Sequence, residues 1–594
     1  MRLYKKYKET SPEETVGRIK KILFDCGIEV KEVEQANYNN TFFSAHLHIC
    51  NGGLLPFDLT TNGKGISPEY ALASAYGELM ERIQTGILFK QRSFLAKPYQ
   101  KELSSETNDL KRLNYYYAPD EIVLYGEEYK ETIDNYVHTF NNEEVKTKYM
   151  NDFEILLPFY NVMDKRIDNI PQRILEHCCG SNGMCAGNTP QEAILQGIYE
   201  IFERYALRKL YEDNLTPPDI PIECFKDCKA FDYIQQLIST NGYDIKIKDC
   251  SVGKDLPVIG VLIIDPISKC YDFHLGADPV PYIALERVFT ELYQNSNKLQ
   301  LKPINFETQS RLLSDVKLKE DERVNYSFQR NNMPISIFGN KPSYYSKWFC
   351  SEDLGRSNDS DLSFTVSLLK REGYSLYVRD VSFLGFPSYI VYIPGMSELI
   401  NVESMRWFNA TFEKNDRITE IAHHLPLVSN SEIKELLGLI SKFKEPEYLR
   451  FFNTDDVWYS GNPLFVLGVL AMVVADYSLA IKYLSKAITP NLNFRLKRLY
   501  SLFLDYASVI NNASSYMSSL ALVYKEEELE LVNKCINQGE WRNLFNLSSC
   551  FDCYGCKQSS SCAYKDYSEL LFNREKMYEA NIIDQNKLIN VFGV

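Results

Sequence analysis

Two stretches of the chain repeat the same spacing of acidic residues. Residues 71–83 read ALASAYGELMERI and residues 193–205 read AILQGIYEIFERY. In each stretch an alanine is followed seven positions later by Glu and three positions after that by Glu-Arg. Residues three apart share one face of a helix. The sequence therefore predicts two helices, each with a pair of carboxylates on one side.

The first pair is Glu78 with Glu81, and the second is Glu200 with Glu203. Glu192 lies eleven residues before Glu203, which returns it to nearly the same side of the helix. Because the other positions of both helices are mostly apolar or small, we expect the carboxylates to point inward. Inward carboxylates repel one another unless cations neutralise them, and Mg²⁺ with its oxygen ligands would do so. The hypothesis is a Mg²⁺-nucleotide site; the alternative is two surface helices with solvated Glu-Arg faces.

Glycine-containing segments precede both helices. Residues 61–65 read TNGKG, residues 180–183 read GSNG and residues 186–190 read AGNTP. Glycines near a helix N-terminus let backbone N–H groups approach an anion, so these segments are predicted as turns bordering the site. Residues 188–190, Asn-Thr-Pro, also fit a helix-capping signal, which explains that stretch without a ligand.

Other parts of the chain must hold these helices in place. Residues 11–25 start with Ser-Pro and two Glu and continue at helical spacing, as an N-capped helix does. Alternating or continuous apolar runs predict strands within 41–50, 257–264 and 376–393. Strands and helices mix without strict alternation, so we expect an α+β fold.

The strand pattern ends near residue 425 and a Leu-, Ala- and Lys-rich helical pattern follows. The predicted parts are a mixed α+β domain at 1–425, a helical region at 426–535 and a cysteine-rich segment at 536–594. Small residues at tetratricopeptide-like intervals lie within residues 468–490, where two helices would cross closely. These positions are Gly468, Ala480 and Ala487, with Leu484.

Three motifs together resemble the YcaO family. They are TNGKGISPEYALASAYGELMER at 61–82, SNGMCAGNTPQEAILQGIYEIFER at 181–204 and GADPVPYIALERVFTELYQ at 276–294. The similarity runs from about residue 8 to residue 410, and the overall layout is similar to that of long members with a tetratricopeptide-like C-terminal region. The resemblance implies that residues 1–425 form a YcaO-type domain that binds ATP and Mg²⁺, with a homodimer as the usual assembly.

The resemblance also implies two sets of site residues. The Mg²⁺ ligands would be Glu78, Glu81, Glu192, Glu200 and Glu203. The ATP contacts would be Lys8, Thr15, Ser74, Asn188, Arg204 and Arg287, with Thr15 in place of a serine. Arginine donates paired hydrogen bonds to phosphate, and asparagine both donates and accepts. For Arg287 the alternative is an ion pair with Glu291, four residues further on the same helix.

The activity implied is ATP-dependent activation of a backbone amide in a peptide or ribosomal-protein substrate, as in the biosynthesis of modified ribosomal peptides. The amide oxygen is phosphorylated after a nucleophile adds, and the product is an azoline, thioamide or amidine. The last hundred residues lack the proline-rich tail of azoline-forming members, which argues against cyclodehydration. One alternative is an ATP-binding accessory factor for β-methylthiolation of ribosomal protein S12, working with a methylthiotransferase or sulfur-donor partner. A small-molecule ATPase or ligase is the other.

Four cysteines lie close together near the C-terminus in the pattern Cys-x2-Cys-x2-Cys-x5-Cys. They are Cys550, Cys553, Cys556 and Cys562. Four thiolates at this spacing can bind one Zn²⁺ or an iron–sulfur cluster. Redox or sulfur-transfer thiols, and chance clustering, remain as alternatives.

The composition argues against several classes of binding partner and against a membrane-spanning protein. The 594 residues carry 65 Lys and Arg against 79 Asp and Glu, a formal charge of −14. This balance argues against nucleic acid and anionic membranes as partners. The longest apolar run, residues 464–475, is short of the roughly 20 residues that span a bilayer. The charged start, MRLYKKYK, leads into no apolar segment, so we expect a cytoplasmic protein.

Overall fold

The computed structural model describes the larger part of the chain. The described residues are 8–33, 41–49, 60–87, 118–125, 153–172, 174–226, 228–293, 299–315, 318, 332–346, 357–399, 418, 421, 428–441, 462–488, 494–544 and 573–592. The predicted metal ligands Cys550, Cys553, Cys556 and Cys562 lie outside them, so the Zn²⁺ or iron–sulfur site stays a prediction.

A three-stranded antiparallel sheet carries the first glutamate helix. Its order is β1 (Val30–Val33), β2 (Phe43–Ile49) and β3 (Thr60–Gly65), and α1 (Pro12–Asp25) and α2 (Pro68–Thr85) pack with it. Leu47 and Ile49 of the sheet meet Leu79 and Met80 of α2 in one apolar cluster. The N-capped helix and the strand predicted at 41–50 are both confirmed.

A six-stranded antiparallel sheet forms the second layer. Its order is β4-β5-β13-β14-β7, with β6 paired to β5. The strands are β4 (Ile122–Tyr125), β5 (Phe153–Asn161), β6 (Arg166–Pro171), β7 (Met184–Ala186), β13 (Tyr377–Asp380) and β14 (Ser388–Tyr392). The run predicted as strand at 376–393 is therefore two antiparallel strands with a turn between them. The π-helix η4 (Ile174–Cys179) also belongs to this part of the fold.

A five-stranded antiparallel sheet forms the third layer, in the order β12-β11-β10-β9-β8. Its strands are β8 (Asp219–Ile220), β9 (Asp244–Asp249), β10 (Val258–Asp265), β11 (Cys270–Ala277) and β12 (Lys302–Pro303). Helices α7 (Lys229–Asn241) and α8 (Pro281–Leu292) cover one face. The shorter helices around it are η5 (Ile222–Phe225), α9 (Phe306–Arg311) and η7 (Ile335–Phe338).

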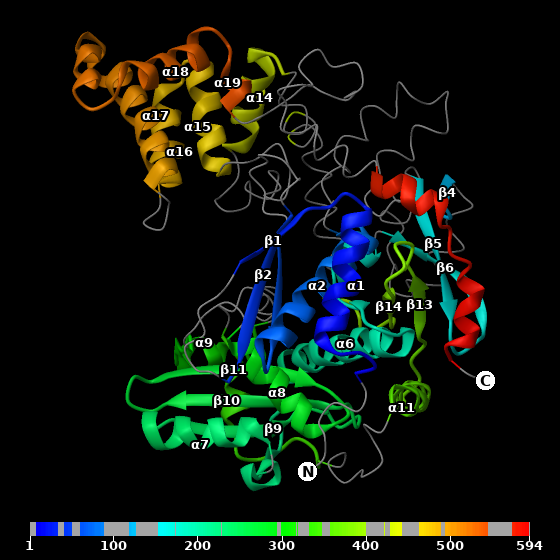
Figure 1. The fold of residues 1–594 in the computed structure, drawn as a ribbon. Coiled ribbons are helices and arrows are strands. Elements are labelled where there is room, and N and C mark those ends of the chain that lie inside the picture. The colour runs from blue at the N-terminus through cyan, green and yellow to red at the C-terminus, as the bar shows by residue number, and fades with distance from the viewer. Residues whose placement is uncertain are drawn as a thin grey trace.

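Helix α6 (Pro190–Glu212), the second glutamate helix, lies between the two larger sheets (Figure 1). Its side chains share one apolar cluster with Tyr389 and Val391 of β14 and with Phe273 and Leu275 of β11. Helix α11 (Asn358–Arg371) packs against it. Gly197 allows the close contact with the sheet, because a Cβ there would lie 2.9 Å from Cys185 Sγ. Antiparallel sheets joined through helices confirm the predicted α+β fold.

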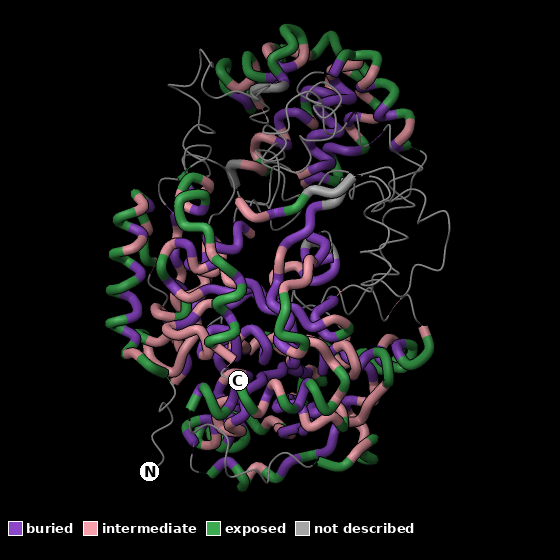
Figure 2. Tube along the Cα trace, turned by 90° about the vertical axis from the view of Figure 1, so that its right-hand side faces the viewer, coloured by how far each residue is buried: buried purple, intermediate pink, exposed green. Residues whose placement is uncertain are grey.

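A separate helical lobe follows the mixed part (Figure 1). It contains α14 (Asn430–Ile440), α15 (Pro463–Val473), α16 (Tyr477–Ala487), α17 (Phe494–Ala513), η11 (Ser514–Leu522), α18 (Glu526–Asn537) and α19 (Trp541–Leu544). Its own apolar core is visible as the upper group of buried residues in Figure 2. Gly468 of α15 contacts Leu484 of α16 so closely that a Cβ would overlap it, as expected for a tight crossing. The helical nature of this region is confirmed, and the tetratricopeptide repeat stays a prediction. Among the described helices, none is long and apolar enough to cross a membrane.

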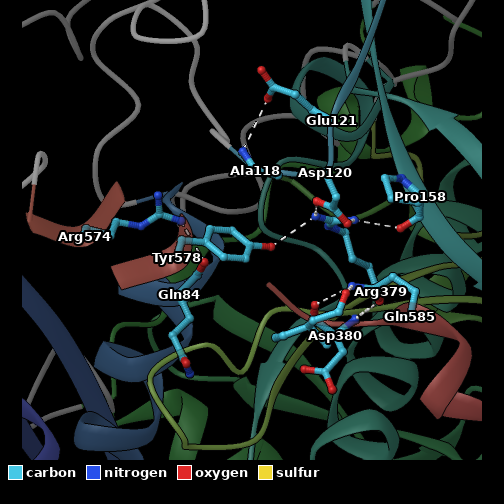
Figure 3. Close-up of polar contacts among 11 residues, drawn as sticks. Gln84, Ala118, Asp120, Glu121, Pro158, Arg379, Asp380, Arg574, Tyr578 and Gln585 are labelled. Atoms are coloured by element: carbon cyan, nitrogen blue, oxygen red, sulfur yellow. Dashed lines mark hydrogen bonds and ion pairs between the residues drawn. The ribbon is translucent and has the colours of Figure 1, made fainter. Parts of the chain in front are cut away.

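The C-terminal residues return to the mixed part and pack beside α2 and the six-stranded sheet (Figure 3). A helix over residues 573–580 precedes η13 (Gln585–Asn590). Arg574, which is only 4% exposed, donates from Nε to the carbonyl of Ile83 (2.6 Å) and from Nη2 to that of Gln84 (2.8 Å). These contacts join the C-terminal segment to the end of the first glutamate helix.

Buried Arg379 of β13 holds the same segment to the six-stranded sheet (Figure 3). Its guanidinium donates to both carboxylate oxygens of Asp120, at 2.6 and 3.1 Å, and to Tyr578 Oη at 3.1 Å. Gln585 exchanges two hydrogen bonds with the backbone of Asp380, at 2.8 and 3.0 Å. A buried arginine is tolerated because its donors are paired. The division of the chain at 425 and 535 stays a prediction, with residues 573–592 packed against the mixed part.

Candidate functional site

The two glutamate helices start in the same way. The side chain of Ser67 accepts a hydrogen bond from Tyr70 N–H at the start of α2, and Thr189 accepts one from Glu192 N–H at the start of α6. Each cap is followed by a proline at the first helical position, where no backbone N–H is needed. The predicted capping role of residues 188–190 is confirmed. The repeated sequence is thus a repeated structural unit.

Residues 180–183 form the predicted turn, whereas Gly63 and Gly187 serve helix packing. Residues 61–65 belong to strand β3, so the predicted turn is wrong there. A Cβ on Gly63 would overlap the carbonyl of Ala71 in α2, and one on Gly187 would lie 2.8 Å from Ala193 N in α6. Only glycine permits such close approach of strand and helix. These positions are therefore explained by the contact between each strand and its own helix, without an anion.

The α2 carboxylates flank an arginine. Arg82 lies 3.2 Å from Glu78 Oε1 and 3.4 Å from Glu81 Oε1, and Glu81 is only 14% exposed. Burial raises the pKa of the Glu81 carboxyl well above its usual value, and the nearby charge of Glu200 raises it further against the opposing effect of Arg82. One arginine therefore does not neutralise this group of carboxylates.

The α6 carboxylates adjoin the same group. Burial raises the pKa of Glu200, and Glu203 adds to this, while Arg204 and Arg82 oppose it. The interaction of Glu200 with both Arg82 and Glu81 brings α6 and α2 together at this point. The sequence predicts carboxylates that point inward, and Glu81 and Glu200 are close enough for the charge of one to act on the other.

Side chains from β3 and α8 complete the group. Lys64 of β3 forms an ion pair with Glu291 of α8, and Arg287 of α8 donates to Gln196 Oε1 of α6 (2.7 Å). The structure therefore differs from the alternative in which Arg287 pairs with Glu291: Glu291 pairs with Lys64 and Arg287 contacts Gln196. Burial lowers the pKa of Lys64 to about 8, although the charge of Glu203 opposes this shift.

A second polar group surrounds the N-terminal end of α6. Lys8 Nζ donates to Glu192 Oε1 (2.9 Å), and Asn188 Nδ2 donates to the same oxygen (3.3 Å). Thr15 Oγ1 donates to Asn188 Oδ1 (2.8 Å). Glu192 is 6% exposed, so Lys8 and Asn188 satisfy a buried carboxylate. Four predicted site residues from two distant parts of the sequence, residues 8–15 and 188–192, meet here.

Asp278 links the two groups. It precedes α8 and accepts a hydrogen bond from Val280 N–H (2.9 Å). Burial raises its pKa to about 7; the backbone bond, Arg287 and Lys8 oppose this shift, and Asp361 of α11 adds to it. Arg287 belongs to the group around Glu200 and Lys8 to the group around Glu192. Because the charges of both act on Asp278, the two polar groups form one polar strip along α6. Glu192 and Glu200 are eight residues apart, or about 12 Å along the helix axis.

Most of the predicted site residues therefore lie along one strip, on α1, α2, α6 and α8 and on the residues just before α1 and α6. Ser74, one turn before Glu78 on α2, is exposed. Within the described ranges, no three His, Cys, Asp or Glu side chains are close enough together to hold a metal ion as they stand. The donor set nevertheless suits Mg²⁺, because carboxylate oxygens are its preferred protein ligands. Burial first, and neighbouring carboxylates second, raise the pKa of Glu81 and Glu200, so a cation there would favour their ionised forms.

Sequence reasoning missed four members of this strip, namely Lys64, Gln196, Asp278 and Glu291. All four occur inside the three quoted motifs, but none of them is repeated between the two glutamate helices. Their contacts join β3, α6, α8 and α11. No local sequence pattern predicts contacts between elements so far apart in the chain.

Comparison with known proteins identifies one matching family and several relatives. Residues 62–397 match the family model described as YcaO cyclodehydratase, ATP- and Mg²⁺-binding. The chain is 24% identical over 595 residues to the ribosomal protein S12 methylthiotransferase accessory factor YcaO of Escherichia coli K12, covering 94% of this chain and 97% of that protein. It is 25% identical over 423 residues to an uncharacterized protein of Haemophilus influenzae, covering 68% and 67%. A solved structure of YcaO from Methanopyrus kandleri bound with AMPPCP and Mg²⁺ is similar with a TM-score of 0.39 and 13% identity, covering 67% and 94%.

Proposed function

The chain belongs to the YcaO family, and we propose that it uses ATP and Mg²⁺ to activate a backbone amide of a peptide or protein. The observation that carries the proposal is the meeting of carboxylates from α2 and α6 with cationic side chains from α2, α6, α8 and β3. Alternating charges of this kind suit a metal–triphosphate complex, in which cations and anions also alternate.

Glu78 and Glu81 of α2 and Glu200 and Glu203 of α6 would hold Mg²⁺. Burial raises the pKa of Glu81 and Glu200, so a divalent cation would stabilise their ionised forms and remove the repulsion between the helices. Bound Mg²⁺ would neutralise phosphate charge during phosphoryl transfer. The protein's own task is to keep four carboxylates from two helices at one place.

The nucleotide would lie along the strip on α6. Arg204 and Arg287 would contact phosphate oxygens, for which a guanidinium is well shaped. The group at the N-terminal end, with Lys8, Thr15 and Asn188, would bind the other end together with Ser74. Glu192, which the family resemblance assigns to Mg²⁺, lies about 12 Å along the helix axis from Glu200, so in this proposal it would serve that end of the site instead. That distance would separate the two ends of this site.

Amide activation explains why such a site is needed. An amide oxygen is a poor leaving group, whereas phosphate is a good one. After a nucleophile adds to the amide carbon, Arg204 and Arg287 would stabilise the negative charge that passes between the oxygen and the phosphoryl group. The nucleophile determines whether the product is a thioamide, an amidine or an azoline. A homodimer and a sulfur-donor partner belong to the proposal as well.

A second function is favoured by one comparison. The similarity to the Escherichia coli accessory factor extends over 94% of this chain, beyond the matched family model at 62–397. This extent supports an accessory role in S12 methylthiolation, in which the helical lobe binds a methylthiotransferase and ATP is bound without amide turnover. Helical hairpins provide such binding surfaces in other proteins.

The experiment that separates the two functions measures phosphate release from Mg-ATP by the full chain. It is run alone, with ribosomal protein S12 and with an unrelated protein of similar size, and the mass of S12 is determined afterwards. Phosphate release stimulated by S12 together with a changed S12 mass supports amide modification. Binding of Mg-ATP without stimulated release or mass change supports the accessory function.

A further inference from the structure

Lys64 lies in the TNGKG segment, whose glycines are explained by helix packing but whose lysine is not. On β3, Thr61 and Gly63 face α2, since Thr61 Oγ1 donates to the carbonyl of Ala75 (3.1 Å) and Gly63 contacts Ala71. Successive residues of a strand point to opposite faces. Lys64 therefore projects away from α2, toward α6 and α8.

On that side Lys64 meets three elements of the candidate site. Its ammonium pairs with Glu291 of α8, and the side chains of Lys64 and Glu291 are 28% and 24% exposed. The charges of Glu203, Arg204 and Arg287 also act on it, and burial lowers its pKa to about 8. Both side chains are partly exposed, and the neighbours of Lys64 are the residues proposed to hold Mg²⁺ and phosphate.

Three cations, namely Lys64, Arg204 and Arg287, lie close enough to oppose one another. Arg287 and Arg204 both favour the neutral form of Lys64, whereas Glu203 and Glu200, which we propose as Mg²⁺ ligands, favour its charged form. If Lys64 served only to pair with Glu291, Arg204 and Arg287 would not be needed beside it. A gathering of cations that repel one another is typical of a site for a polyanion.

We propose that Lys64 is a phosphate-binding residue of this site and that it leaves Glu291 for a terminal phosphate oxygen when Mg-ATP binds. A lysine suits such an exchange because its compact charge sits on a flexible four-carbon chain and moves without backbone change. Glu291 holds the ammonium in position in the nucleotide-free protein. This inference rests on the proposed function and adds a residue to it.

Calorimetric titration of the full-length protein with Mg-ATP and with AMP provides the test. Lys64→Met is expected to weaken Mg-ATP binding about tenfold or more and AMP binding less than about twofold, since AMP lacks the terminal phosphates. Lys64→Arg is expected to retain most of the affinity. Lys31→Met is the matched control, because Lys31 is an exposed lysine of β1 in the same sheet.

Equal losses for Mg-ATP and AMP in Lys64→Met would overturn the inference, since they would mean that Lys64 only tethers β3 to α8. Unchanged Mg-ATP binding in Lys64→Met would overturn it as well, while leaving the proposed function intact. Absence of Mg-ATP binding by the wild-type protein would overturn both.

A measurement on the wild-type protein covers the case in which Lys64→Met does not fold. An ATP acyl phosphate acylates lysines next to the bound phosphates, and mass spectrometry identifies the labelled residue. Labelling of Lys64 that is blocked by excess Mg-ATP, with Lys31 unlabelled, is the expected result. Absence of label at Lys64 while other lysines of the site are labelled would contradict the assignment.

Discussion

Lys8 and Glu192 form a 2.9 Å ion pair although they are 184 residues apart in the sequence. The pair holds the residues before α1 against the N-terminal end of α6. Glu192 is 6% exposed whereas Lys8 is 40% exposed, so the lysine is the member that solvent and ligands reach. The contact places the N-terminal segment at one end of the strip that we propose as the nucleotide site.

Lys8→Met should lower the affinity for Mg-ATP about tenfold and also lower the melting temperature moderately, because the buried Glu192 keeps its hydrogen bond from Asn188 but loses its ion-pair partner. Calorimetry and thermal melts measure the two effects. Lys21→Met is the control, since Lys21 is 76% exposed and pairs with Asp25 on α1. A large loss of stability with unchanged nucleotide binding would mean that Lys8 only anchors the N-terminal segment.

Gly63→Ala should destabilise the protein by about 1–3 kcal/mol, because the added methyl group overlaps the backbone of α2. Gly77→Ala, on α2 itself, has open space around the new methyl group and should stabilise the protein by up to about 1 kcal/mol through helix propensity. Urea unfolding of both variants checks this. Equal stability of the two variants would contradict the close packing of β3 on α2.

Asp278→Asn should stabilise the nucleotide-free protein at neutral and higher pH. Burial raises the pKa of Asp278 from 3.8 to about 7, so the folded protein favours the protonated carboxyl. The contribution of this preference to the free energy of unfolding is complete below about pH 4 and is lost as the pH rises through about 7. Asparagine keeps the hydrogen bond from Val280 without the charge. The melting temperature of the variant minus that of the wild type should rise between pH 4 and pH 8 and then level off. A difference independent of pH would show that Asp278 does not titrate in this range.

Arg574→Met should destabilise the protein by about 1–3 kcal/mol, because two buried carbonyls at the end of α2 lose their donor. Arg311→Met removes an arginine that is 59% exposed and pairs with Asp315, so its effect should be below about 0.5 kcal/mol. Thermal and urea unfolding compare the two. Similar, small effects would argue against a role for the C-terminal segment in holding α2.

Local patterns accounted for much of the fold. The glutamate helices and the N-capped helix over 11–25 were predictable because apolar spacing and capping residues act within a few turns. Residues 61–65 were predicted as a turn because their glycines come just before a helix N-terminus. The structure shows that glycine is required there by the approach of α2.

Contacts between residues far apart in the sequence could not be predicted from local patterns. The carboxylate pairs could be placed on their helices, but the side chains that meet them could not. Nothing local indicates that Lys64 pairs with Glu291, or that Arg574 donates to Ile83 across 491 positions. The family resemblance supplied Lys8, Thr15 and Asn188, whose contacts with one another and with Glu192 appear only in three dimensions.

The central claim is that carboxylates of α2 and α6 hold Mg-ATP. Titration of Mg-ATP into wild-type protein, Glu203→Gln and Glu212→Gln tests it most directly. Glu212 lies on the same helix, is 41% exposed and pairs with Lys209, so Glu212→Gln controls for loss of one charge on α6. We predict binding by the wild type and Glu212→Gln, with at least about tenfold weaker binding by Glu203→Gln. Equal binding by all three proteins, or none by the wild type, would contradict the account.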